Sequence, residues 1–398
     1  MNTKKYKTRT EFIERKNAKK NGVWEIGLDI GYSAVKAFSP NSISCFPAFA
    51  IKSDELQFIG KTPKEVIMYK DLTTNETWVV GEYAQNDIKA SDTSVSEALL
   101  YSRDRYTSKA FEIYARTGIG VSMMNNMYGS PEDDRIVIQT GLPERYLNDK
   151  YDLIDVLSGN HNFALKVGND DWTFFNITIS PEDVDVISQP KAAMFCVCID
   201  NNGKLVPQYT SILNGKSEES NTIVFDPGFG TLDIFILEKA QVKEGQTYPD
   251  LGMKRVFKET SALISENFGV DIPVYAMQRY LEDGLIKVID KKAFLLGNKD
   301  AYKEYSFDKL LAQASNMVCD EAIARMVDAI GFESLSSYRN IIVTGGTGAA
   351  WMHNIEEKFK IIPSIKVINA NVNDNLPSIY NNVRGYYLYR YTKLLRED

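Results

Sequence analysis

The sequence predicts an α/β protein made of two similar halves. Two segments carry this expectation: VWEIGLDI followed by VKAF at 23–38, and TIVFDPGFGTLDIFIL at 222–237. In each, an apolar strand ends in an aspartate and a glycine-containing turn, and a second apolar strand follows. A third apolar strand at 340–348 runs into the glycine-rich stretch TGGTG. One hairpin design used twice indicates two domains of similar fold.

Further elements follow from periodicity and from turn residues. Alternating or continuous apolar runs bounded by Gly, Pro or Asn predict strands, and apolar residues at helical spacing predict helices. Cys196 and Cys198 alternate in AMFCVCI, which predicts a buried strand with both cysteines in the core. The other strands are expected at 77–80, 135–143 and 172–179, and the helices at 97–117, 259–268, 273–287, 307–330 and 378–395.

Length and composition are those of an ordinary globular protein. The chain has 398 residues, of which 25% are charged and 44% are hydrophobic, and this length suits two or three domains of ~150 residues. No apolar run reaches the ~18 residues of a membrane span, and the basic N-terminus lacks the apolar core of a secretory signal. Four scattered cysteines exclude a disulfide framework and a zinc ribbon. We therefore expect a soluble, cytoplasmic protein with reduced thiols.

Histidine content and charge narrow the chemistry. Only His161 and His353 are present, which leaves acid–base work to carboxylates, amides or water. The net charge is −7, although residues 1–20 hold eight Lys or Arg against two Glu. The acidic remainder disfavours direct binding to nucleic acid. Residues 1–22 are expected to form a basic, solvated and disordered extension.

Each hairpin has residues suited to a polyphosphate. Glycine in a turn lets backbone N–H groups approach a phosphate oxygen, and an aspartate at a strand end can hold Mg²⁺ through water. The first hairpin supplies Asp29, Gly31, Tyr32, Ser33 and Lys36, and the second supplies Asp226, Gly228, Phe229, Gly230 and Thr231.

The order of these motifs resembles the superfamily of actin, sugar kinases and heat-shock ATPases. The segments DIGYSAVK, ISQPKAAMF, FDPGFGTLD, VTGGTGAAW and NNVRGYY stand where that superfamily has two phosphate hairpins, two connecting segments and an adenosine-binding turn. Within it, the length and the GLP segment at 141–143 look most like the ParM-type plasmid-segregation actins. The resemblance implies an actin-like fold with two ribonuclease-H-like domains around a nucleotide cleft. It places one domain at 23–190 plus about 375–398 and the other at 191–374.

The resemblance also implies roles for individual residues. Asp29 and Asp226 would organise Mg²⁺, and the hairpin residues with Lys36 would hold the phosphates of ATP, or of GTP. Gln189 would position the attacking water, where ParM-like relatives often have Glu. Gln278 and Glu282, one helical turn apart, are candidates for the base or ribose. The residues expected against the ribose and adenine are Gly345, Gly346, Thr347 and Gly348.

The implied function is an ATPase that forms head-to-tail filaments. It would segregate plasmid DNA through a ParR-like DNA-binding adaptor, without a membrane partner. The alternatives are a sugar-type kinase, for which Gln189, Asp183 and Asp185 offer no clear base, and a cell-division or phage-encoded actin homologue. A chaperone-like ATPase is disfavoured because too few residues follow position 390 for a peptide-binding domain.

Overall fold

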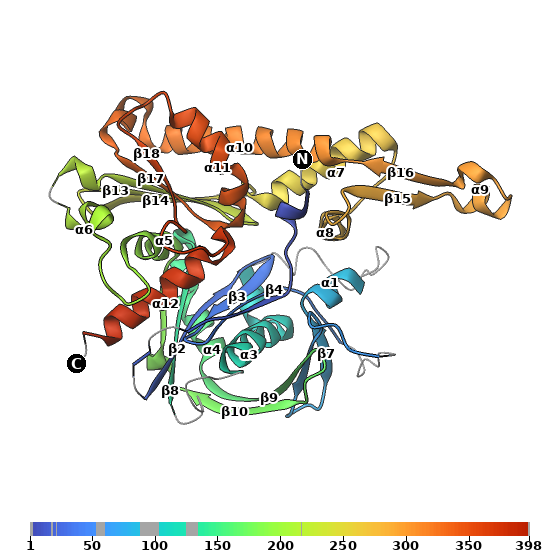
Figure 1. Ribbon diagram of the computed structural model, residues 1–398, viewed down its shortest axis with the longest axis horizontal. Helices are drawn as coiled ribbons and strands as arrows, with labels where there is room; N and C mark the ends of the chain where they lie inside the picture. Colours follow the sequence, from blue (N-terminus) through green and yellow to red (C-terminus); the bar gives the residue numbers. More distant parts are fainter. Residues whose placement is uncertain are drawn as a thin grey trace.

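The computed structural model describes residues 3–16, 19–20, 22–52, 60–87, 103–124, 134–215 and 217–396 (Figure 1). Its strands β1 to β11 lie within Glu11–Ser188, called the first half below, and β12 to β18 lie within Thr222–Asn369, called the second half. None of the described helices is both long enough and apolar enough to cross a membrane.

Each half is built on a sheet, and the two sheets have the same topology apart from the extra strand β1 at the edge of sheet I. Sheet I has the order β1-β4-β3-β2-β8-β11 and sheet II the order β14-β13-β12-β17-β18. In both, the hairpin strand pairs are antiparallel and the later strands are parallel. This confirms the predicted α/β fold with two similar halves. The strands of sheet I are β1 (Glu11–Glu14), β2 (Val23–Ile30), β3 (Ala34–Phe38), β4 (Ser42–Pro47), β8 (Arg135–Leu142) and β11 (Val184–Ser188). Those of sheet II are β12 (Thr222–Pro227), β13 (Thr231–Glu238), β14 (Gln241–Pro249), β17 (Asn340–Val343) and β18 (Lys366–Asn369).

The two halves differ in what is added to these sheets. The first half has a second sheet of β5 (Ala50–Lys52), β6 (Ile67–Asp71), β7 (Thr77–Val80), β9 (Gly159–Val167) and β10 (Thr173–Ile179), with helices α1 (Glu82–Asp87), α3 (Lys109–Met123) and α4 (Lys150–Leu157). The second half has helices α7 (Met253–Phe268), α8 (Met277–Tyr280), α10 (Asp308–Ile330) and α11 (Gly345–Phe359). It also has a two-stranded arm of β15 (Leu285–Ile289) and β16 (Tyr302–Ser306), with α9 (Lys291–Leu295) at its tip, which projects from the body (Figure 1).

Two helices lie between the sheets. Helix α5 (Gln189–Cys198) packs on sheet II through Ala193 and Val197, and α12 (Asn381–Leu394) packs on sheet I through Val383 and Tyr387. They cross closely, since a Cβ on Gly385 would lie 2.0 Å from the Ala192 carbonyl oxygen. The small helix α6 (Thr210–Asn214) follows α5. The α5–α12 crossing therefore joins the halves at the base of the cleft between them.

Three sequence predictions of secondary structure are wrong. AMFCVC belongs to α5 rather than to a strand, because Pro190 lies in the first turn of a helix that begins at Gln189; Cys196 and Cys198 are nevertheless buried, as expected. The helix expected at 273–287 is largely replaced by short turns and by β15. The helix expected at 97–117 begins only at Lys109, where Ser108 accepts a hydrogen bond from the Phe111 N–H, and residues 97–102 lie outside the described residues.

The expected disordered extension at 1–22 is also wrong for the described residues. Residues 3–6 form a short 3-10 helix with Thr3 and Tyr6 buried, and β1 adds a strand to the edge of sheet I beside β4. Tyr6 belongs to the core of the second half. The segment is ordered because it has apolar and carboxylate partners far away in the sequence.

Candidate nucleotide site

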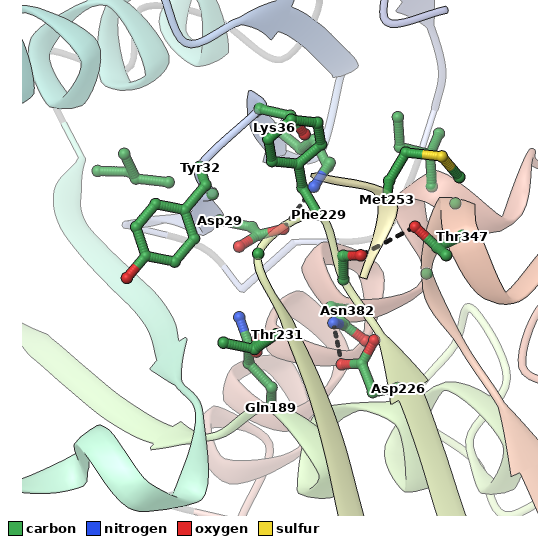
Figure 2. Close-up of a pocket in the computed structure, with 18 of the residues that line it drawn as sticks. Asp29, Tyr32, Lys36, Gln189, Asp226, Phe229, Thr231, Met253, Thr347 and Asn382 are labelled. Atoms are coloured by element: carbon green, nitrogen blue, oxygen red, sulfur yellow. Dashed lines mark hydrogen bonds and ion pairs between the residues drawn. The ribbon is translucent and has the colours of Figure 1, made fainter. Parts of the chain in front are cut away.

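The two hairpins face one cavity, and the first presents a charge pair to it. Asp29 is the second-last residue of β2 and lies opposite Lys36 of β3 in the antiparallel register. The Lys36 Nζ lies 2.8 Å from Asp29 Oδ2 (Figure 2). The turn closes with a hydrogen bond from the Gly31 N–H to the Ala34 carbonyl, 2.9 Å long. The Lys36 ammonium is thus held by its own hairpin, next to the turn that carries Tyr32 and Ser33.

The second hairpin has a carboxylate where the first has a lysine. Asp226 of β12 lies opposite Asp233 of β13, and both are buried. The Asn382 side chain donates to Asp226 Oδ2 at 2.8 Å (Figure 2), while Thr231 and Thr247 donate to Asp233. Burial, together with a neighbouring carboxylate, raises the pKa of Asp226 to about 6 and that of Asp233 to about 7. The pair therefore favours a cation beside it.

Helix α11 brings its N-terminus to the second hairpin. Gly345 begins the helix with a φ of +75°, and a Cβ there would lie 3.0 Å from Asp226 Oδ1. The Thr347 hydroxyl donates to the Gly228 carbonyl at 2.9 Å. A glycine at 345 is needed both for the left-handed backbone and for the close approach to Asp226. Unpaired N–H groups at a helix N-terminus suit an anion.

Most of the residues expected at the site line this cavity. They are Asp29, Gly31, Tyr32, Ser33, Lys36, Gln189, Asp226, Gly228, Phe229, Gly230, Thr231, Gln278, Gly345, Gly346 and Thr347. Gln189 is the first residue of α5, and Tyr32 reaches across to the second hairpin, since a Cβ on Gly230 would lie 3.1 Å from the Tyr32 ring. The cavity thus joins both hairpins, the start of α5 and the start of α11. Their assigned roles stay predictions.

Two of the expected residues do not line the cavity. Gly348 packs against β17, where a Cβ would lie 2.9 Å from Val343 Cγ1, so its small size serves the packing of α11. Glu282 lies beyond the end of α8, which stops at Tyr280, and its carboxylate contacts Lys4, Lys7 and Arg9. The premise of one helical face shared by Gln278 and Glu282 is therefore wrong.

Among the cavity-lining residues that sequence reasoning missed, three contact the hairpins: Asp233, Asn382 and Arg105. Asp233 could have been found as the position opposite Asp226 in the hairpin, whereas Asn382 gave no local signal. Arg105 lies over the Tyr32 ring, with its Cζ 4.2 Å from the ring centroid, and donates to the Ile30 carbonyl at 2.7 Å. It supports the first hairpin from outside the motif.

The donor set fits Mg²⁺ bound together with phosphates. The described residues contain no cluster of three or more His, Cys, Asp or Glu side chains able to hold a metal ion alone. Mg²⁺ is usually bound by one or two carboxylates, phosphate oxygens and waters, and Asp226 and Asp233 are buried carboxylates beside the cavity. The first predicted ligand, Asp29, has Lys36 as its partner, so Asp226 is the better placed of the two predicted ligands.

Comparisons with known proteins agree with this architecture. Residues 27–191 match the family model for the N-terminal domain of actin-like proteins. The structure of a non-polymerisable quadruple mutant of pCBH ParM is 20% identical to this chain, with 92% of this chain and 99% of that chain covered and a TM-score of 0.69. A 15-stranded ParM filament from Clostridium botulinum gives 19% identity, 94% and 99% coverage and a TM-score of 0.69. An archaeal actin homolog in complex with ADP gives 14% identity, 94% and 100% coverage and a TM-score of 0.60. No curated protein matches the chain.

Proposed function

We propose that this chain, which is an actin-like protein in its fold, binds a nucleoside triphosphate with Mg²⁺ between its halves and couples hydrolysis to filament assembly. The observation that carries the proposal is the meeting of two glycine hairpins, with Asp29 and Asp226, on one cavity that also contains Gln189. The similar structures include a ParM filament and an ADP complex, which supports both parts of the proposal.

The chemistry of each group of residues suits it to a different role in binding or hydrolysis. The glycine turns at Gly31 and Gly228–Gly230 offer backbone N–H groups to the phosphates, and Lys36 adds positive charge. Asp226 would hold Mg²⁺, which when bound neutralises charge on the phosphates. Gln189 would orient the attacking water through its amide, because in-line attack on a phosphate needs orientation more than a strong base. ATP is the first candidate, and GTP is the alternative.

The surface has a feature that supports self-association. Large apolar side chains are exposed at the tip of the arm, where Phe294, Leu295 and Leu296 are 65%, 73% and 76% exposed. Consecutive exposed apolar residues on a projecting element are typical of contact surfaces. We propose that the arm contacts another subunit in the filament. Plasmid DNA would be reached through a ParR-like adaptor, in keeping with the net charge of −7.

Sedimentation tests the coupling of nucleotide to assembly. The purified chain at tens of micromolar should scatter light and pellet with Mg-ATP, and less without nucleotide. The variant Phe294→Ser/Leu295→Asp should pellet much less while it still binds nucleotide. Phe332→Ser, at a position 78% exposed but away from the arm, is the matched control and should pellet like the wild type. A chain that stays monomeric with ATP and phosphorylates a small molecule would instead be a kinase.

A further inference from the structure

The N-terminal strap, defined as Thr3–Glu14, is anchored at one end in the second half. The Thr3 hydroxyl donates to the Leu281 carbonyl at 2.7 Å. The Tyr6 side chain is buried, and its hydroxyl donates to Ser315 Oγ of α10 at 3.1 Å. Trp351 of α11 donates to the same Ser315 oxygen. This end is therefore part of the core of the second half.

The other end of the strap is anchored in the first half. Residues Glu11–Glu14 pair antiparallel with β4, with Glu11 opposite Cys45 and Glu14 opposite Ser42. Tyr380 donates to Glu11 Oε2 at 3.1 Å. Since the two ends belong to different halves, the residues between them span the gap between the halves (Figure 1).

Charged contacts hold the middle of the strap to both halves. Lys7 Nζ lies 3.2 Å from Glu82 of α1 in the first half and 3.3 Å from Glu282 in the second half. The Lys7 side chain is only 9% exposed, which limits screening by solvent. Arg9 also pairs with Glu282, and the Thr10 N–H donates to Glu82 Oε2 at 3.0 Å. Lys7 thus ties a carboxylate of each half to one ammonium group.

The same segment lines the candidate nucleotide site. Residues Lys5–Thr8 border the cavity that the two hairpins share. The Thr8 N–H donates to Gln278 Oε1 at 3.0 Å, and Gln278 Nε2 donates to the Tyr6 carbonyl at 3.4 Å. Gln278, predicted to face the base, is therefore held by the strap. The cavity measures about 150 Å³, below the ~300–1,000 Å³ of most ligand pockets, so the strap borders a narrow site.

We propose that the N-terminal strap forms one wall of the nucleotide site and restrains separation of the halves, so that it sets the rate of nucleotide exchange. The proposal rests on the proposed nucleotide-binding function. Opening the cleft must stretch the strap or break the contacts of Lys7 with Glu82 and Glu282. Weakening these contacts makes opening easier and nucleotide release faster.

The test is the dissociation rate of a fluorescent ATP analogue, chased with excess ATP in a stopped-flow instrument. Glu282→Gln removes the negative charge that Lys4, Lys7 and Arg9 share and should speed release about three- to tenfold. Lys7→Gln should act similarly, and the double variant should release little faster than either single variant, because all three disrupt one set of contacts. Asp283→Asn is the matched control: Asp283 pairs with Lys287 rather than with the strap, and release should stay within about twofold of wild type.

Outcomes separate the two proposals. Wild-type protein that binds the analogue, with Glu282→Gln and Lys7→Gln releasing it at the wild-type rate, overturns the role of the strap and leaves the nucleotide site standing. Wild-type protein that does not bind the analogue overturns the nucleotide site and the strap's role together. Thermal unfolding of each variant shows whether a faster release reflects loss of the fold.

Discussion

The two hairpins share one topology but carry opposite charges at the same position. In the first, Asp29 lies opposite Lys36 and the two form an ion pair. In the second, Asp226 lies opposite Asp233, and neither forms an ion pair with a Lys or Arg of the described residues. The first hairpin thus balances its own charge, whereas the second needs a cation from elsewhere. The same hairpin fold can therefore supply a fixed lysine ammonium group in one half and a binding site for a cation in the other half.

The largest effect is expected at Asp226. Asp226→Ala should abolish nucleotide turnover, a loss of at least about 100-fold, because the bound cation would lose its carboxylate. Phosphate release with Mg-ATP measures the effect. Asp320→Asn, on the exposed face of α10, is the control and should turn over normally. Near-normal turnover by the Asp226→Ala protein would show that the second hairpin does not need this carboxylate to hold a cation.

Removing the lysine of the first hairpin should reduce stability. Lys36→Met leaves the buried Asp29 without its partner, and the free energy of unfolding should fall by about 3 kcal/mol. The double variant Lys36→Met/Asp29→Asn should recover much of the loss, since no buried charge is left unpaired. Urea unfolding monitored by circular dichroism measures both. Equal losses in the single and double variants would show that the pair contributes through packing instead of charge.

Glu25 of β2 is a buried carboxylate outside the cavity, and its effect on stability depends on pH. Its carboxylate accepts a hydrogen bond from Tyr387 at 2.9 Å, and burial raises its pKa from 4.5 to about 7. The folded protein therefore binds more protons than the unfolded chain between about pH 4.5 and 7, so this residue makes stability fall as pH rises through that range.

Glu25→Gln, which resembles the protonated acid, should remove this penalty. We expect it to raise the free energy of unfolding by about 1–3 kcal/mol at pH 8 and by little at pH 5. Denaturant unfolding at the two pH values measures the difference, with the exposed Glu333→Gln as control. A gain of equal size at both pH values would contradict a raised pKa for Glu25.

The smallest effect is expected at Asp233. Asp233→Asn removes one of two neighbouring carboxylates; its amide oxygen can accept from one of the hydroxyls of Thr231 and Thr247, and its NH2 group can donate to the other. The free energy of unfolding should change by less than about 1 kcal/mol, in contrast to the loss expected for Lys36→Met. The same urea titration measures it. A loss of unfolding free energy as large as that of Lys36→Met would show that the Asp233 carboxylate contributes as much to stability as the Lys36–Asp29 ion pair.

The hairpins can be predicted from the sequence alone because the residues that specify them are neighbours in the chain. Apolar strands that end in Asp and Gly at 29–31 and 226–228 identify both the turns and the residues that line the cavity. The arm was missed although Asp283-Gly284 marks a break: Gly284 has a φ of +66° and precedes β15. The helical spacing of the preceding residues outweighed this signal.

The rest of the site depends on contacts between distant residues. Glu282 gave no sign that its partners are Lys4, Lys7 and Arg9, more than 270 positions away. Asn382 meets Asp226 only because α12 returns between the sheets. Such contacts are set by the tertiary fold. The basic composition of residues 1–20 is typical of a solvated tail, and it does not reveal whether the segment binds distant carboxylates.

Electron microscopy of the wild-type chain with and without Mg-ATP tests whether nucleotide bound in this cavity drives filament assembly. Filaments that form with Mg-ATP, and whose density shows the nucleotide between the hairpins at Gly31 and Gly228–Gly230, are the predicted result. Single particles that bind ATP without assembling, or filaments with the nucleotide outside this cavity, would contradict the account.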